Sequence, residues 1–362
     1  VLFVKKSSLL NKGYKFRIYP NNEQIAKIEG NFGCARFVYN YYLSQRIGAY
    51  NSEGKTIGYL EQQNHLPLLK KHYPWLKVAD STSLQISIRN LDKAFQNFFN
   101  NKAFGFPNFK RKKSLRKCYT VNCVNSNIAV KNGKIKLPKL KWVEAKVHRK
   151  VEGRIISATV IKNSSGRYYV SIITEQKKRE ISFIEGENIV SLQMKDFINI
   201  SNEESIYYFK YIKKISKLEI KLLRKEKESN NRKKLEKQIG KLYEKVQNKR
   251  DDFLHNLSKN IVDENQIIYI QEANVKGEKS SVKDYQNLKS FSWSKFCKFL
   301  EYKSSWYNRS LIYVENNDNY FNLNYGQKLL NTNIPINFGD KINVTLMKKI
   351  LHPHSFKYTG IL

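Results

Sequence analysis

Residues 13–24 have the sequence GYKFRIYPNNEQ, in which the pattern of side chains changes from that of a strand to that of a helix. Over 13–19, basic side chains alternate with aromatic or apolar ones, as expected for a strand with one buried face. Pro20 and the asparagines after it end the strand. The stretch therefore predicts a strand with an apolar core face and a cationic outer face, followed by a helix that begins near Glu23.

Helical patterns continue from this strand to about residue 104. Apolar side chains from Ile25 to Leu43 recur at helical spacing, and a second helix is expected from Thr82 to about Asn100. The aromatic residues of both helices are expected to form core contacts in preference to a base-stacking surface. Residues 23–104 are thus expected to be a helical insert.

Beyond the insert, the sequence predicts strands first and then a mixture of helices and strands. Strand-like segments separated by NGK, VEG and SSGR turns predict a small antiparallel barrel, and they lie at 128–137, 145–151, 155–161 and 167–174. Two long packed helices are expected between residues 207 and 257, joined near 229–231. Buried strands at 266–270 and 311–314, with a helix between them, predict an α/β domain.

Charge limits the class of partner. The 362 residues include 66 Lys and Arg against 31 Asp and Glu, and the formal net charge of +35 indicates a polyanion, with nucleic acid as the first candidate. The sequence has no run of about 18 apolar residues to span a bilayer. The opening VLFVKKSSLL lacks a signal-peptide pattern, so a cytoplasmic, nucleoid-associated protein is expected. The four cysteines form no C-x-x-C pair, which disfavours a disulfide framework or a zinc ribbon.

The densest basic patch lies between Phe109 and Tyr119. Six cations fall within eight positions, and they are Lys110, Arg111, Lys112, Lys113, Arg116 and Lys117. A solvated charged loop is the alternative interpretation, but the high net charge of the whole chain favours contact with phosphates.

Several segments together carry a resemblance to a known family. They are YKFRIYPNNEQ (14–24), FGCARFVYNYYL (32–43), DSTSLQISIRNLDKAFQNFF (80–99), GFPNFKRKK (105–113), IKLPKLKWV (135–143), SATVIKNSSGRYYVSI (157–172), NVKG (274–277) and WSKFCKFLEYKSSWYNRSLIYV (293–314). From about Gly13 to about Val314 the chain resembles the TnpB or OrfB proteins of bacterial transposons, which are similar to the ancestors of type V CRISPR effectors.

The resemblance implies an α+β multidomain fold. Residues 1–20 and 105–182 would form a small antiparallel wedge β-barrel, and residues 21–104 an inserted helical recognition lobe. Residues 183–362 would form an α/β RuvC-like (RNase H-like) domain that lacks the zinc ribbon and includes a helical hairpin at 207–260.

The resemblance also implies partners and contact residues. The partners would be a transposon-end-derived guide RNA and double-stranded target DNA with a short flanking motif, with one copy of the protein per RNA. Further phosphate contacts are expected from Lys15, Arg17 and Arg89. Contacts that read the motif are expected near Tyr41, Ser81, Gln85, Thr120 and Asn122, where the Gln85 amide suits a bidentate contact with adenine. For Ser81 and Thr82, helix capping is the equal alternative.

The expected nuclease centre departs from the family pattern. A RuvC-like site uses three carboxylates to hold two divalent ions, and the resemblance puts Ser191, Gln271 and Asn343 at those positions. Glu272 is adjacent to Gln271, but alternation along a strand would point it away. Residues 315–341 contain no cysteine. The expectation is therefore a protein that is not an enzyme and holds neither zinc nor catalytic magnesium, with the His352-Pro353-His354 stretch as an exposed tail.

Four functions remain open at this point. The favoured one is a nuclease-inactive, RNA-guided DNA-binding protein that represses transcription by occupying promoters, similar to the TnpB-like nuclease-dead repressors. The alternatives are a decaying transposon protein, an active nuclease with a site rebuilt from Asp196, Glu272 and Asp340, and a protein that binds structured RNA alone.

Overall fold

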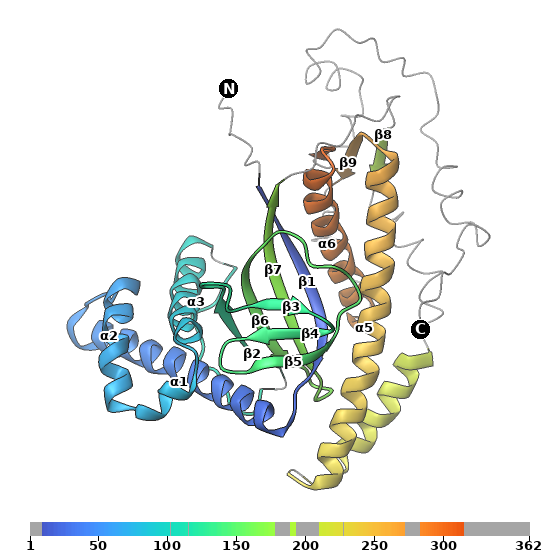
Figure 1. The fold of residues 1–362 in the computed structure, drawn as a ribbon. Coiled ribbons are helices and arrows are strands. Elements are labelled where there is room, and N and C mark those ends of the chain that lie inside the picture. Colours follow the sequence, from blue (N-terminus) through green and yellow to red (C-terminus); the bar gives the residue numbers. More distant parts are fainter. Residues whose placement is uncertain are drawn as a thin grey trace. The chain divides into compact units, whose positions relative to one another are not determined.

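The computed structural model describes residues 9–101, 103–114, 116–177, 189–192, 210–226, 228–271 and 283–314 (Figure 1). Within these, the backbone alone is described for residue 271 and for residues 283–291. The chain divides into two compact units: Val1–Lys178 with Ile215–Glu244, and Arg179–Lys214 with Lys245–Leu362. No helix among the described residues is long and apolar enough to cross a membrane.

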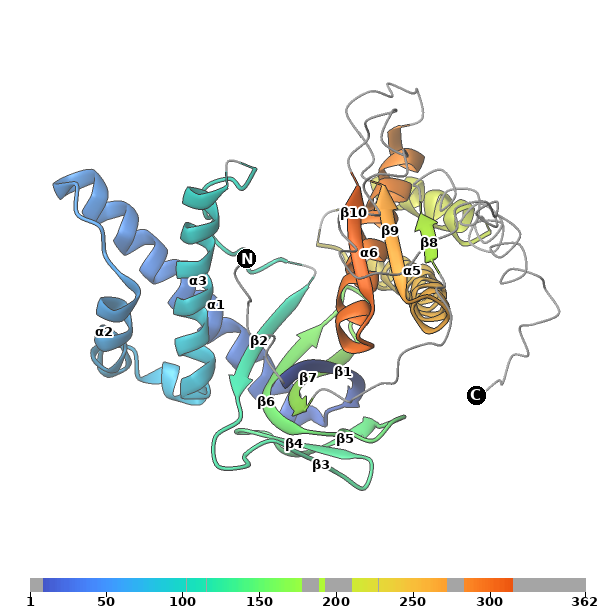
Figure 2. The same ribbon diagram turned by 90° about the horizontal axis from the view of Figure 1, so that it is seen from above.

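The first unit contains a seven-stranded antiparallel sheet in the order β2-β6-β7-β1-β5-β4-β3. Its strands are β1 (Leu9–Tyr19), β2 (Lys117–Asn122), β3 (Ala129–Lys131), β4 (Lys134–Leu137), β5 (Lys141–Lys146), β6 (Arg154–Lys162) and β7 (Tyr168–Lys177). The sheet curls (Figure 2), so that Tyr119 of β2, at one end of the order, and Ile135 of β4, next to the other end, belong to one buried cluster.

β1 has the two faces that its sequence predicts. Tyr14, Phe16 and Ile18 are buried in the core of the sheet, whereas Lys15 is exposed on the opposite face. The prediction of an apolar and a cationic face is confirmed, because side chains alternate along an extended backbone.

Two strand predictions need correction. The segment expected as one strand at 128–137 is a hairpin of β3 and β4, since Asn132 and Gly133 both take positive φ, at 51° and 69°, in the two-residue turn. Such turns match the twist of paired strands. The strand expected at 145–151 is β5, which begins at Lys141 because the chain returns directly after Leu137, and its pairing with β1 ends at Lys146.

Three helices and a short 3-10 helix precede β2. They are α1 (Asn22–Glu53), α2 (Tyr59–His72), η1 (Pro74–Val78) and α3 (Ser81–Asn100). α1 begins with a capping box, in which the Asn21 side chain accepts from the Gln24 backbone at 2.8 Å and the Gln24 side chain accepts from the Asn21 backbone at 3.1 Å. The helices share their own buried cluster, which includes Tyr42, Leu69 and Leu84. The predicted helix starts near Glu23 and Thr82 are confirmed.

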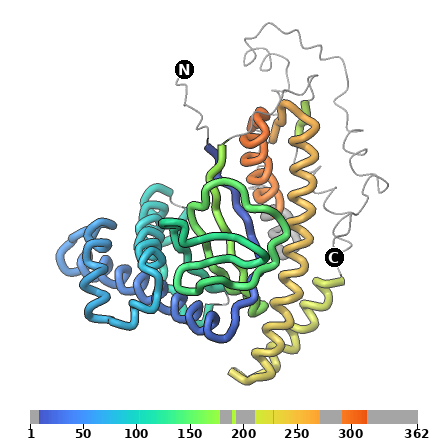
Figure 3. Tube along the Cα trace, in the orientation of Figure 1, coloured from blue at the N-terminus to red at the C-terminus, as the bar shows by residue number. Residues whose placement is uncertain are grey.

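A helical hairpin completes the first unit (Figure 3). A helix at residues 210–223 is followed by α5 (Asn230–Glu264), as the sequence predicts. Near the end of this unit, the Glu244 carboxylate accepts hydrogen bonds from Asn163, Arg167 and Tyr169. α5 also approaches the turn between β6 and β7 so closely that a Cβ at Gly240 would lie 2.8 Å from the Ser164 backbone. The hairpin is therefore fixed to the sheet.

The second unit has a parallel sheet in the order β10-β9-β8, formed by β8 (Ile189–Leu192), β9 (Ile267–Gln271) and β10 (Ser310–Val314). The later part of α5 and α6 (Lys283–Trp306) supply its buried cluster, which includes Leu257, Ile261 and Phe296. Parallel strands that alternate with helices confirm the α/β prediction for this region.

Candidate nucleic-acid interface

The basic loop, residues 110–114, is held to α1 by a single amide side chain. Asn40 donates to the Lys110 carbonyl at 3.0 Å and accepts from the Lys110 backbone N–H at 2.8 Å. The Lys110 ammonium lies 3.9 Å from the centre of the Tyr39 ring, and burial lowers its pKa. This role of Asn40 is not visible in the sequence, because nothing in a helical pattern indicates a partner seventy residues away. The backbone of the loop is therefore positioned in advance of any ligand.

Lys110 packs against Tyr39, and the other five cations of the patch divide into two groups. Lys113 pairs with Glu228 at 2.5 Å and Lys117 pairs with Glu29 at 3.1 Å. Arg111, Lys112 and Arg116 are exposed and make no ion pair with any residue that the structure describes. These three side chains have the freedom to contact phosphates, whereas Lys117 already takes part in an internal network.

That network is centred on Glu29 of α1. Its carboxylate also accepts from Lys162 at 2.5 Å and from the Tyr168 hydroxyl at 3.2 Å. Burial acts to raise the pKa of Glu29, but the hydrogen bonds from Lys162 and Lys117 outweigh it and the pKa is lowered. Glu29 thus connects α1 to β2, β6 and β7.

The start of α3 meets the end of β2. Asp80 is the N-cap of α3, because its side chain accepts from the Thr82 backbone at 2.9 Å. The capping role considered for Ser81 and Thr82 is therefore wrong: the Ser81 hydroxyl accepts from Lys70 at 3.0 Å, and the Thr82 hydroxyl accepts from the Asn122 backbone at 3.1 Å. The junction brings Ser81 and Asn122, both expected to read a motif, into one region.

Of the other side chains expected to read a motif, Gln85 and Thr120 lie on α3 and β2, and Tyr41 lies on α1. Gln85 is half-buried and Arg89 is exposed one turn further along α3, while the Thr120 hydroxyl contacts that of Thr159 at 2.8 Å. Tyr41 lies in an aromatic cluster on the helices, with its ring 5.9 Å from Phe37 and 6.3 Å from His65.

Lys15 and Arg17 lie on the outer face of β1. The Lys15 ammonium is 5.0 Å from the centre of the Tyr169 ring, and the Arg17 guanidinium is 4.9 Å from that of Tyr19. These contacts hold both cations against aromatic rings, so the two side chains are partly ordered on the sheet surface.

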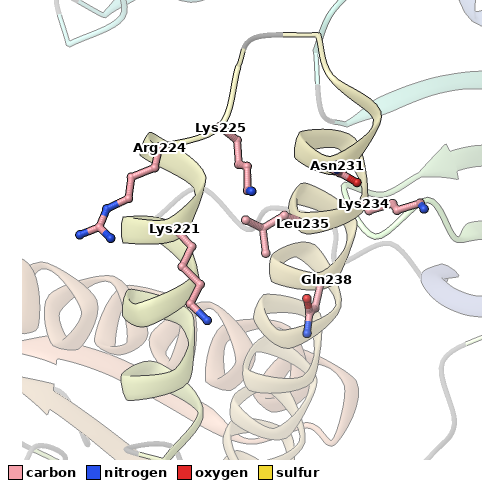
Figure 4. Close-up of a pocket in the computed structure, with 7 residues that line it drawn as sticks. All are labelled: Lys221, Arg224, Lys225, Asn231, Lys234, Leu235 and Gln238. Atoms are coloured by element: carbon pink, nitrogen blue, oxygen red, sulfur yellow. The ribbon is translucent and has the colours of Figure 1, made fainter.

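The hairpin carries a basic pocket of about 440 Å³ near its tip. In Figure 4, Lys221 and Lys225 point into the space between the two helices, next to Leu235. The lining contains no carboxylate and consists of Lys221, Arg224, Lys225, Asn231, Lys234, Leu235 and Gln238. Its chemistry suits an anion, and the sequence predicted the two packed helices but not a pocket between them.

The expected nuclease positions lie on adjacent parallel strands. Ser191 of β8 is opposite Tyr269 of β9, and Gln271 is the last residue of β9, opposite Val314 of β10. Both are therefore near the carboxyl ends of their strands. Asn343, Asp196, Glu272 and Asp340 lie outside the described residues. Within the described residues, no group of three or more His, Cys, Asp or Glu side chains is placed to hold a metal ion.

Two family models for OrfB proteins of IS605-type elements match the chain. One, described as a helix-turn-helix domain, matches residues 8–55, and the other, described as a probable transposase, matches residues 187–282. A putative RNA-guided DNA endonuclease of Streptomyces pristinaespiralis is 28% identical over 319 residues, which cover 84% of this chain and 78% of that protein. The chain belongs to the TnpB/OrfB family.

Two further relatives of this TnpB/OrfB chain match it over different lengths. The putative RNA-guided DNA endonuclease InsQ of Escherichia coli K12 is 28% identical over 271 residues, 73% of this chain and 66% of InsQ. The virulence protein VsdF of Salmonella dublin is 40% identical over 110 residues, 27% of this chain and 91% of VsdF. A solved Cas12f1–sgRNA–target DNA complex has a TM-score of 0.48 at 13% identity, covering 91% of this chain and 96% of that one.

The names of two relatives contradict the prediction about catalysis. The prediction that this TnpB/OrfB protein is not an enzyme is wrong, because two relatives at 28% identity are named as DNA endonucleases. The prediction depended on the residue types at Ser191, Gln271 and Asn343, and the last of these lies outside the described residues.

Proposed function

We propose that this protein binds duplex DNA under the direction of a guide RNA, and that binding at a promoter represses transcription. The observation that carries the proposal is the match, over 84% of the chain, to a relative named for RNA-guided action on DNA. The net charge of +35 supports it, since a guide and a target duplex together present a dense array of phosphates.

The basic loop supplies the phosphate contacts in this proposal. Arg111, Lys112 and Arg116 are exposed. The Asn40 hydrogen bonds fix the backbone at Lys110, directly before Arg111. A positioned loop loses less conformational entropy on binding than a mobile one. Lys15, Arg17 and Arg89 would add contacts from the sheet and from α3.

The junction of α3 and β2 supplies the motif-reading contacts. Ser81, Gln85, Thr120 and Asn122 carry hydroxyl and amide groups on two elements that a hydrogen bond from Asn122 to Thr82 joins. Amide side chains can form paired hydrogen bonds with adenine in the major groove. Tyr41 would extend this surface along α1.

We also propose that each region of the fold corresponds to one domain of the TnpB/OrfB proteins. The seven-stranded sheet would correspond to the wedge, α1 to α3 to the recognition lobe, and the parallel sheet with α5 and α6 to a RuvC-like domain. The curl of the antiparallel sheet and the parallel order β10-β9-β8 support these assignments. One copy of the protein would hold one RNA.

The experiment is to purify the protein from cells that carry its native flanking DNA and to sequence the RNA that remains bound. We expect one discrete small RNA. A reporter promoter that matches the variable end of this RNA should then lose expression, and binding and cleavage of the matched duplex are measured as separate readouts. A protein that carries only a random sample of cellular RNA would contradict the proposal.

A further inference from the structure

Four phenylalanine rings are exposed where α3 ends and the basic loop begins. Phe99 is 72% exposed, Phe104 52%, Phe106 46% and Phe109 52%. Isolated exposed apolar side chains are common, but four large rings within eleven positions are a concentration that marks an interaction site. We call Phe99, Phe104, Phe106 and Phe109 the phenylalanine shelf.

Ring contacts hold part of the shelf in place. Phe106 meets Phe95 and Phe98 edge-on, with ring centres 5.5 Å and 5.4 Å apart. Phe99 is stacked on Phe95 at 6.3 Å and tilted against Phe98 at 5.1 Å. The geometry falls in the range of favourable aromatic pairs, so the outer faces of Phe99 and Phe106 are presented by a fixed cluster.

The layer beneath the shelf is fixed by an ion pair. The Arg46 guanidinium lies 5.0 Å from the centre of the Phe95 ring, and Arg46 is paired with Asp92 at 3.0 Å. The Arg46 side chain is largely buried, and its second hydrogen bond goes to Gln62 at 3.1 Å. Arg46 of α1 therefore holds Phe95 in place, and Phe95 in turn contacts the rings of Phe99 and Phe106.

The charge around the shelf identifies the kind of partner. Arg89 and Lys93 are exposed before it on α3, and Arg111 and Lys112 are exposed after it. From Arg89 to Ser114 the sequence has one acidic residue, Asp92, and this residue is already paired with Arg46. A second copy of a chain with a net charge of +35 would meet repulsion here, whereas a polyanion would meet attraction.

We infer that the phenylalanine shelf stacks the unpaired bases of a single-stranded nucleic acid, while the flanking cations contact its backbone. Aromatic rings beside a basic track are the arrangement that binds single strands without sequence preference, because every base has a face that can stack. The inference deepens the proposed function, on which it rests for its biological setting. It adds an unpaired strand to the paired guide and target as a partner of the protein.

The test is the affinity of the full-length protein for a short fluorescent single strand that has no complement and no guide sequence. Phe99→Ala with Phe104→Ala should weaken binding by a factor on the order of five or more for each ring. Phe99→Trp should retain or strengthen binding, because tryptophan stacks at least as well. Trp142→Ala serves as the matched control, since Trp142 is a 42% exposed aromatic residue on β5.

Three results separate stacking from other roles. An abasic strand of equal charge should bind the double variant and the original protein equally, and the slope of affinity against salt should be unchanged. Phe99→Leu should lose binding although it keeps an apolar side chain.

Full binding by Phe99→Leu, or equal losses on the abasic strand, would overturn the inference. So would a concentration-dependent dimer that dissociates in the double variant. Because the probe has no guide match, its binding is measured independently of a guide RNA. A protein that binds the probe through the shelf but shows no RNA-guided binding would therefore support this inference and contradict the proposed function.

Discussion

The Asn40 side chain is hydrogen-bonded to both backbone polar groups of Lys110, at 3.0 Å and 2.8 Å. It fastens the basic loop to the middle of α1. We predict that Asn40→Ala frees the loop at a cost of about 1 to 3 kcal/mol in local stability, because two hydrogen bonds are lost. Amide hydrogen exchange at residues 110–114 should accelerate while exchange in β6 and β7 stays unchanged. Equal acceleration in the sheet would show instead a general loss of folding.

Removing two exposed cations should change how nucleic-acid binding depends on salt. Each phosphate contact contributes roughly 0.9 to the slope of log affinity against log salt on duplex DNA. Arg111→Ala with Lys112→Ala should therefore lower the slope by up to about 2 and weaken all duplexes alike. Lys131→Ala with Lys136→Ala, on the exposed outer positions of β3 and β4, is the control of equal charge. A slope that falls equally in both double variants would show that the loop has no special role.

Gln85→Ala should affect only targets with the correct flanking motif. A bidentate amide contact contributes about 1 to 3 kcal/mol of discrimination between bases. Binding to a panel of duplexes that differ only in the flank would check this. Equal losses on every flank would remove Gln85 from motif reading and leave it a role in the packing of α3.

Acid should weaken the contact between α1 and the sheet through Glu29. The pKa of Glu29 in the folded protein lies below its ordinary value of 4.5, so its stabilisation is complete above about pH 4.5 and is lost as the pH falls through the lower folded value. Glu29→Gln should cost about 1 kcal/mol at pH 7, after screening by solvent. The difference between the two proteins in unfolding free energy, from urea titrations at pH 3 to 7, should shrink below pH 4.5. A constant difference would contradict this.

Local patterns were enough to predict several elements. Alternation in β1 and the helix start near Glu23 depend on residues close together in sequence, and both are present in the structure. The NGK turn is recognisable in the sequence, but the segment 128–137 that contains it was predicted as one strand, and the structure has two strands that pair across the turn at Asn132 and Gly133. α2 contains Pro67, which weakens its helical pattern.

The candidate interface was predictable only in part. The basic loop was evident from composition, but which of its cations are paired depends on Glu29 and Glu228, which lie 88 and 115 residues away from their partners. The phenylalanine shelf was not predicted, because periodicity does not reveal which side of a helix remains uncovered and three of its four residues follow the end of α3. The prediction that the protein is not an enzyme depended on residue identities at the expected nuclease positions, and the names of two relatives contradict it.

The most direct test of the central claim is a guide exchange. The purified protein is loaded with its own RNA or with the same RNA carrying a different variable end, and its affinity for the two matching duplexes is measured at one salt concentration. The account predicts that each loaded complex prefers the duplex that its own RNA matches, and that the preference reverses when the RNA is exchanged. Identical affinity for both duplexes with either RNA would contradict RNA-guided binding.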